Sequence, residues 1–140
     1  MISCFLDTNV LLDWVLDRRP FSKEAFAISG LTENRTIESA ASSASVYTVN
    51  YFVRKVNNSV KTNEIVRRMI SIINLVPTQK PDVILALNSN AKDLEDAYQY
   101  FTALSHRGID YFVTRNVNDF VRFESRLPVI TPADFLATVD

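Results

Sequence analysis

Three separate stretches of the chain carry acidic side chains where a divalent cation could be bound. Asp7 directly follows a short apolar run, and Asp119 lies in a polar turn after a second apolar run. Between them in the sequence, Asp93 and Asp96 are three residues apart, a spacing that puts both on one face of a helix. Hard cations such as Mg²⁺ and Mn²⁺ prefer oxygen ligands. We therefore expect a metal site wherever the fold brings these stretches together.

Such a site would favour hydrolysis of a phosphodiester bond. Clustered carboxylates resist ionisation unless a cation relieves their repulsion. Bound divalent ions can activate a water molecule and neutralise charge on a phosphodiester during in-line displacement. Other hydrolytic chemistry has less support, because the chain has one histidine, His106, and no nucleophile elbow or glycine-rich phosphate loop.

The elements that would position these acids follow from the hydrophobic pattern. Residues 2–6 and 111–114 are short apolar runs typical of buried parallel strands, and functional groups of parallel α/β sheets lie beyond the carboxyl ends of the strands. Weaker strands are predicted at 36–40, 75–76 and 128–130. Helical spacing or capping predicts helices at 10–16, 22–31, 44–56 and 63–73, from Pro81, from Asp93 to Gly108, and from Pro132 after a Thr131 cap, with a turn at 57–61.

Strands that alternate with helices predict a three-layer α/β/α sandwich around a central parallel sheet. The 140 residues fit a single domain, and the composition, 47% hydrophobic with 2 glycines, is that of a globular protein. The net charge of −1 gives no long-range attraction for nucleic acid, so a polyanion would need a local basic patch or metal ions.

The sequence also suggests where the protein resides. The single cysteine, Cys4, excludes an intramolecular disulfide and favours a reducing, cytoplasmic setting. The N-terminal run is interrupted by Asp7 and lacks a preceding positive charge, which argues against a signal peptide. We find no apolar stretch of roughly 20 residues, the length that a membrane helix requires, and expect no membrane association.

Three sequence motifs resemble those of PIN-domain nucleases, including the VapC-type toxins of toxin–antitoxin pairs. They are FLDTNVLLD, DLEDAYQYFTA and DYFVTRNVNDF, in the family's order, and ITPADFL resembles the last strand and helix of the family. The resemblance implies a PIN-like fold, a Mg²⁺- or Mn²⁺-dependent endoribonuclease and an RNA substrate. It also implies a possible cognate antitoxin and a possible homodimer.

The resemblance assigns roles residue by residue. It implies that Asp7, Asp96 and Asp119 are the catalytic acids and principal metal ligands, assisted by Asp93 and by Asn116, which stands where many relatives have Asp. Thr114 would orient a ligand or water, and Thr8 and Asn9 would support the turn around Asp7. Arg115, inside the last motif, is a possible contact to a substrate phosphate.

One departure from the family pattern favours an alternative function. Relatives usually carry a second acid early in the helix predicted at 44–56, where this chain has Thr48, and no acid occurs between Glu38 and Glu64. A catalytically weak or silent PIN-like module that binds RNA or protein is therefore the alternative. A phosphoryl-transfer enzyme of the haloacid-dehalogenase type is disfavoured, because Asn9 stands where its second Asp would be.

Three of the acids, Asp7, Asp93 and Asp119, also have a purely structural interpretation. Asp7 and Asp93 each precede a predicted helix, where a carboxylate can cap the free backbone N–H groups. Asn116 and Asp119 could serve only to stabilise a turn.

Overall fold

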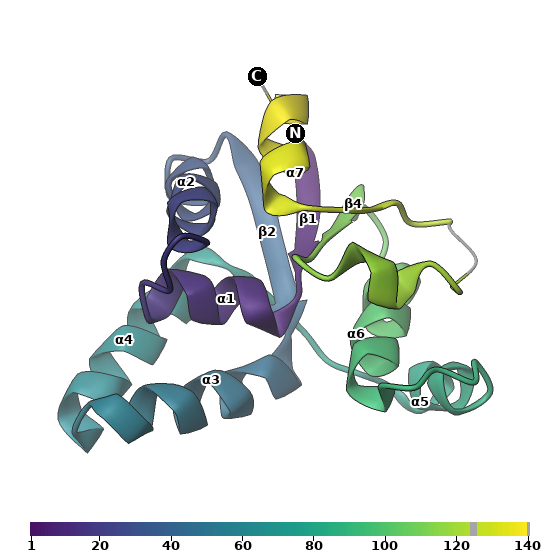
Figure 1. The fold of residues 1–140 in the computed structure, drawn as a ribbon, viewed down its shortest axis with the longest axis horizontal. Coiled ribbons are helices and arrows are strands. Elements are labelled where there is room, and N and C mark those ends of the chain that lie inside the picture. Colours follow the sequence, from purple (N-terminus) through teal and green to yellow (C-terminus); the bar gives the residue numbers. More distant parts are fainter. Residues whose placement is uncertain (124–125, 140) are drawn as a thin grey trace.

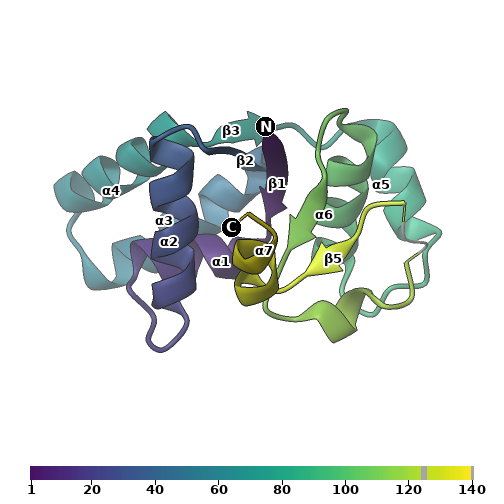
Figure 2. The same ribbon diagram turned by 90° about the horizontal axis from the view of Figure 1, so that it is seen from above.

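The computed structural model describes residues 1–123 and 126–139. Its centre is a five-stranded parallel sheet with the strand order β3-β2-β1-β4-β5, visible edge-on in Figure 2. The N-terminal strand is thus central, and β4 lies beside it with Leu6 opposite Val113. The strands are β1 (Ile2–Leu6), β2 (Ile37–Ser42), β3 (Asn74–Val76), β4 (Tyr111–Val113) and β5 (Val129–Ile130).

Helices cover both faces of the sheet, which confirms the predicted α/β/α architecture (Figure 1). Figure 2 shows α5 and α6 on one side of β1, with α2 and α4 on the other. The helices are α1 (Thr8–Val15), α2 (Ser22–Glu33), α3 (Ser43–Val56), α4 (Ser59–Ile72), α5 (Lys80–Leu87), α6 (Leu94–Ser105) and α7 (Pro132–Val139), and a short 3-10 helix, η1 (Val117–Phe120), follows β4.

The alternation of side chains along β1 divides the core into two parts. Cys4 and Leu6 pack with residues of α1 to α4 and α7, whereas Phe5 points to the other face and packs with residues of α5 and α6. On that second face Phe5 stacks on Phe112 of β4, with ring centroids 5.5 Å apart. Because successive residues of a strand point to opposite faces, a strand buried on both sides is mostly apolar, as β1 is apart from Ser3.

Several predicted boundaries were wrong at helix ends. The turn predicted at 57–61 is shorter, because the Asn58 side chain accepts a hydrogen bond from the backbone of Lys61 and caps a helix that begins at Ser59. The helix α6 ends at Ser105 and not at Gly108, which lies in the following turn with φ 91°. Val56, the last residue of α3, is 71% exposed.

The predicted start of α7 is confirmed: the hydroxyl of Thr131 accepts a hydrogen bond from the backbone of Asp134 at 3.1 Å. Across residues 1–123 and 126–139, none of the helices has the length and hydropathy of a membrane span.

Candidate functional site

The Asp7 side chain lies at the carboxyl end of the central strand and is almost completely buried. The backbone around it connects two strands, because the amide of Asp7 donates to the carbonyl of Val113 at 3.0 Å. Its Oδ2 accepts hydrogen bonds from the hydroxyl of Thr114 at 2.8 Å and from the amide of Asn9 at 3.2 Å. Asp7 occupies the N-cap position of α1, but its carboxylate makes no capping hydrogen bond. The hydrogen bonds that hold the carboxylate therefore include side chains of α1 and of the turn after β4.

The hydroxyl of Thr114 is the centre of a small hydrogen-bond network. It donates to Asp7 and accepts from the backbone N–H of Asn116 at 3.1 Å and from Asn9 Nδ2 at 3.4 Å. The other amide atom of Asn9, Oδ1, is buried and has no hydrogen-bond partner among the described residues. The network thus leaves one acceptor oxygen beside Asp7 without a donor.

Thr8 connects this network to two more helices. Its backbone N–H donates to Oε1 of Gln99 on α6 at 3.1 Å, and its hydroxyl lies 2.7 Å from the hydroxyl of Ser45 on α3. Gln99 and Ser45 are both buried, and the sequence analysis missed both. Gln99 could have been found, since it lies three residues after Asp96 and shares its helical face. Ser45 carried no comparable signal.

Asp93 and Asp96 lie at the start of α6. Asp93 caps the helix, since its Oδ1 accepts from the backbone N–H groups of Glu95 at 2.9 Å and Asp96 at 3.3 Å. The predicted N-cap contact of Asp93 is therefore present. This capping leaves its negative charge close to Asp96.

The acids of the three sequence motifs lie close enough for their negative charges to repel one another. The pKa of Asp96 is raised to about 7, first by burial and then by the negative charges of Asp7, Asp93 and Asp119. Burial also raises the pKa of Asp7, and hydrogen bonds from Thr114 and Gln99 oppose that rise. A carboxyl that resists ionisation because of its neighbours is the expected signature of acids gathered without a cation.

Asp96 and Asp119 share a pocket of about 290 Å³. Asp93 and Asn118 also line it, whereas Asp7 is buried and is not among its lining residues. Two cations, Lys92 and Arg122, line the same pocket, and neither had been singled out from the sequence. The pocket therefore combines carboxylates with positive charges that could contact a phosphate.

Asn116 contributes to the site mainly through its backbone. Its N–H donates to Thr114, and its carbonyl accepts from the N–H of Asp119 at 2.9 Å, which starts η1. Asn118 rather than Asn116 lines the acidic pocket. Thr48, at the expected position of the second acid, is half-buried on α3, one helical turn after Ser45 and on the same face.

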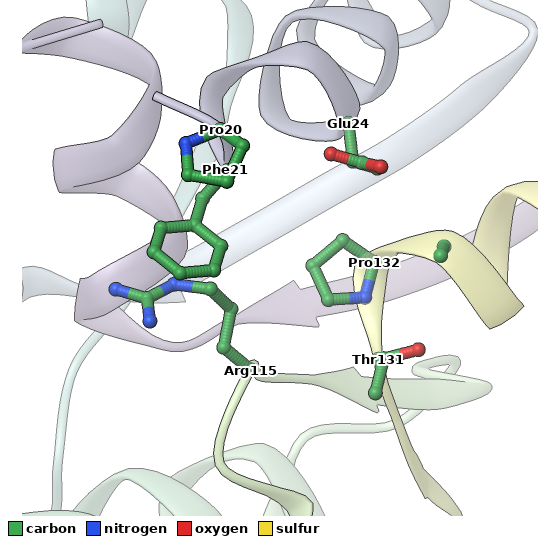
Figure 3. A pocket seen from close by; sticks show the side chains of 7 residues that line it. Pro20, Phe21, Glu24, Arg115, Thr131 and Pro132 are labelled. Atoms are coloured by element: carbon green, nitrogen blue, oxygen red, sulfur yellow. The ribbon is translucent and has the colours of Figure 1, made fainter. Parts of the chain in front are cut away.

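Arg115 is directed to a different pocket. Its guanidinium pairs with the buried carboxylate of Asp13 and lies over the ring of Phe21. Figure 3 shows this stacking at a pocket of about 360 Å³ that Pro20, Glu24, Thr131 and Pro132 also line. The structure thus does not place Arg115 among the residues of the acidic pocket.

The donor atoms of the acidic site fit a hard divalent cation. They are carboxylate oxygens, together with the unpaired amide oxygen of Asn9 beside Asp7. Within residues 1–123 and 126–139, however, no three His, Cys, Asp or Glu side chains already enclose a space for an ion. Binding would therefore require the carboxylates to draw closer together.

Comparisons with known proteins agree with the fold. A family model described as the PIN domain matches residues 3–118. The solved structure of VapBC2 from Rickettsia felis bound to a promoter DNA fragment has a chain of similar fold, with a TM-score of 0.69 and 14% identity, covering 93% of this chain and 98% of that one. DNA-bound VapBC from Salmonella typhimurium gives a TM-score of 0.69 and 18% identity, over 94% and 99% of the two chains.

A third structure, a toxin–antitoxin complex from Klebsiella pneumoniae, has a chain 26% identical to this one with a TM-score of 0.65, covering 92% of this chain and 97% of that one. No curated protein sequence gives a significant match. The two structures below 25% identity support the fold alone.

Proposed function

The chain belongs to the PIN-domain family, whose members are generally nucleases, and we propose that it is a Mg²⁺- or Mn²⁺-dependent endoribonuclease acting as the toxin of a toxin–antitoxin pair. The proposal includes Asp7, Asp96 and Asp119 as the principal metal ligands, with Asp93 and Asn116 assisting. It treats residues 1–140 as one catalytic domain that acts in the cytoplasm.

The observation that carries the proposal is the convergence of three distant acidic stretches. Asp96 and Asp119 line one pocket, and Asp7 binds Thr114, which begins the turn that leads to Asp119. In agreement with this, burial and then the neighbouring charges, chiefly those of Asp7 and Asp93, raise the pKa of Asp96. Repulsion between carboxylates lowers the stability of the fold, so such clusters are typically found where a function requires them. Carboxyls with perturbed pKa values in a pocket are characteristic of catalytic sites.

Bound divalent cations would supply an activated water and would neutralise charge on the phosphodiester. The residues around Asp7 hold its carboxylate in position for metal binding. Thr114 and Asn9 hold the Asp7 carboxylate in one orientation, and the buried contacts of Thr8 fix the turn that carries it. Lys92 and Arg122 stand where they can hold the RNA backbone beside Asp96.

The proposed partners come from the related structures. The related structures are VapBC complexes and a toxin–antitoxin complex, and we extend this to a cognate antitoxin for the present chain. A homodimer is a further expectation of the family resemblance.

A catalytically silent RNA- or protein-binding module remains the second candidate. It is favoured by Thr48, which leaves the site with one fewer negative charge than the usual pattern of the family. Under this alternative the same pocket would bind a ligand without cleaving it.

The test compares cleavage of a mixed RNA substrate by the wild-type protein and by the Asp7→Asn variant, with Mn²⁺ and with EDTA. Wild-type cleavage that requires the metal and is absent from Asp7→Asn would support the nuclease. Asp134→Asn, which neutralises an exposed acid at the start of α7, is the matched control and should cleave like the wild type. Equal cleavage by wild type and Asp7→Asn, or none by either, would favour the silent module.

A further inference from the structure

We propose that Asp13 and Arg115 are positioning residues that clamp the catalytic turn of residues 114–119 onto α1. The inference rests on the proposed nuclease function and assigns Arg115 a role other than contact with a substrate phosphate. It starts from the ion pair between the two side chains.

The pair has the geometry of a specific contact. Arg115 Nε lies 2.6 Å from Oδ2 of Asp13, and a terminal guanidinium nitrogen lies 3.2 Å from Oδ1. Two parallel hydrogen bonds of this kind fix both the distance and the orientation of the guanidinium. Its carbon also lies 4.0 Å from the centroid of the Phe21 ring, which covers one face of the guanidinium (Figure 3). The arginine is therefore held in place on two sides.

The pair joins a buried carboxylate to a partly buried guanidinium, which makes it costly to break. The Asp13 side chain is 1% exposed and that of Arg115 is 25% exposed. Loss of one partner would leave the other charge without compensation in the interior. By contrast, a well-packed apolar pair of similar volume is often as stable as a buried ion pair. Stability alone therefore does not explain why charges are placed here.

The position of the ion pair gives a better explanation of why charged side chains are used here. Arg115 directly follows Thr114, whose hydroxyl binds Asp7, and Asp7 and Asp13 lie at the N-cap and in the body of the same helix, α1. Two consecutive residues of the turn are thus attached to two points of one helix. A segment that contacts a rigid element at two points can no longer pivot freely about a single contact.

The far end of the turn is anchored separately. The ring of Phe120 is buried, 4.8 Å from that of Phe112 on β4. Asp119 lies between this anchor and the clamp, so the position of its carboxylate relative to Asp7 and Asp96 depends on both. Small displacements of reacting groups lower rates strongly, by up to about 100-fold for 1 Å.

The charge of Arg115 is unsuited to a direct role in substrate binding. Asp13 neutralises it, and the ring of Phe21 covers one face of the guanidinium. Asp13 also occupies Nε and one terminal nitrogen of the guanidinium, which leaves fewer N–H donors for a phosphate. The two hypotheses therefore differ in what they predict for Asp13, which has no reason to matter if Arg115 simply binds RNA.

The experiment measures RNA cleavage by Asp13→Asn, by Arg115→Gln and by the double variant. With the clamp, each single variant loses about 10- to 100-fold in kcat with little change in KM, and the double variant is no worse than either. A substrate contact would instead raise KM in Arg115→Gln and spare Asp13→Asn, which would overturn the inference. Neutralisation of the exposed pair Glu33 and Arg68 is the matched control and should leave kcat unchanged.

A further variant separates positioning from stability. Asp13→Leu combined with Arg115→Met replaces the pair with apolar side chains, and we expect its melting temperature to be within a few degrees of the wild type while kcat stays low. Wild-type kcat in this variant would show that the pair is only structural.

Amide hydrogen exchange tests the clamp without relying on activity. We expect faster exchange of the amides of residues 114–120 in Asp13→Asn and Arg115→Gln than in the wild type. If the wild-type protein cleaves no RNA, the proposed function fails, and this faster exchange would still support the clamp. Unchanged exchange in both variants would overturn the clamp whatever the activity.

Discussion

The hydroxyl of Thr114 lies 2.8 Å from Oδ2 of Asp7, although 107 residues of sequence separate them. The contact forms because β1 and β4 are adjacent and parallel, with Leu6 opposite Val113, so the next residue of each strand leaves the sheet at the same edge. It links the first acidic motif directly to the last. The predictions below concern this contact and the acids around it.

Replacement of Thr114 by Ala should impair catalysis through Asp7. The hydrogen bond lowers the pKa of Asp7, so its loss should raise that pKa further and move the acidic limb of the pH–activity profile to higher pH. A hydrogen bond to a charged group contributes roughly 1.5–3 kcal/mol, which corresponds to a loss of about 10- to 100-fold in kcat/KM. Thr114→Ser keeps the hydroxyl and should retain most activity. An unchanged Asp7 pKa in Thr114→Ala, measured by carboxyl NMR, would contradict this prediction.

Asp96 should make the metal-free protein less stable as the pH rises. Its pKa is raised to about 7 in the folded protein, against 3.8 for an unperturbed Asp, so its contribution to stability is present below about pH 4 and is lost as the pH rises through 7. Asn resembles the protonated form. Asp96→Asn in EDTA should therefore match the wild type near pH 4 and exceed its unfolding free energy at pH 8. Because Asp96 is partly exposed, we expect a difference on the order of 1 kcal/mol.

The measurement is chemical denaturation of both proteins between pH 4 and pH 9. With Mn²⁺ at pH 8 the wild type should have the higher unfolding free energy of the two proteins. Only the wild type has the full set of carboxylates to bind the ion. A difference between the two proteins that does not vary with pH would contradict the role given to Asp96.

The cations of the acidic pocket should bind RNA. With a net charge of −1 the whole molecule does not attract RNA, so local charges must do so. Lys92→Gln combined with Arg122→Gln should raise KM about 10-fold and should flatten its dependence on salt by close to the loss of two phosphate contacts. The measurement is KM for a short RNA at several salt concentrations. Arg67→Gln, on the exposed surface of α4, is the control, and an equal effect there would indicate only a change of net charge.

Restoring an acid at position 48 should strengthen metal binding. Thr48 lies on the same face of α3 as Ser45, which contacts Thr8 beside Asp7. Thr48→Glu should tighten Mn²⁺ binding about 10-fold, since one well-placed opposite charge contributes on the order of 1 kcal/mol at partial exposure. Thr48→Gln has the same shape without the charge and should bind Mn²⁺ like the wild type. Calorimetric titration that finds Glu and Gln equivalent would show that position 48 is not the missing ligand.

Much of the architecture could be predicted from the sequence, because strands and helices have characteristic local periods. The apolar run at residues 2–6 predicted the central strand, and Thr131 before Pro132 predicted the start of α7. The rule that parallel strands present functional groups at their carboxyl ends placed Asp7 and the turn after β4 at one edge. Helix ends were less accurate, because the Asn58 cap and the turn at Gly108 act outside the repeating pattern.

The partners of individual side chains were decided by the tertiary structure alone. Asp13 falls within the first motif and Arg115 within the last, yet nothing in either stretch indicates that the two side chains meet. Gln99 and Ser45 became part of the site only when α6 and α3 were packed against the turn that carries Asp7. The physical reason is that hydrophobic periodicity reports which face of an element is buried. It does not report which side chain of a distant element that face will meet, because that depends on strand order, register and helix packing.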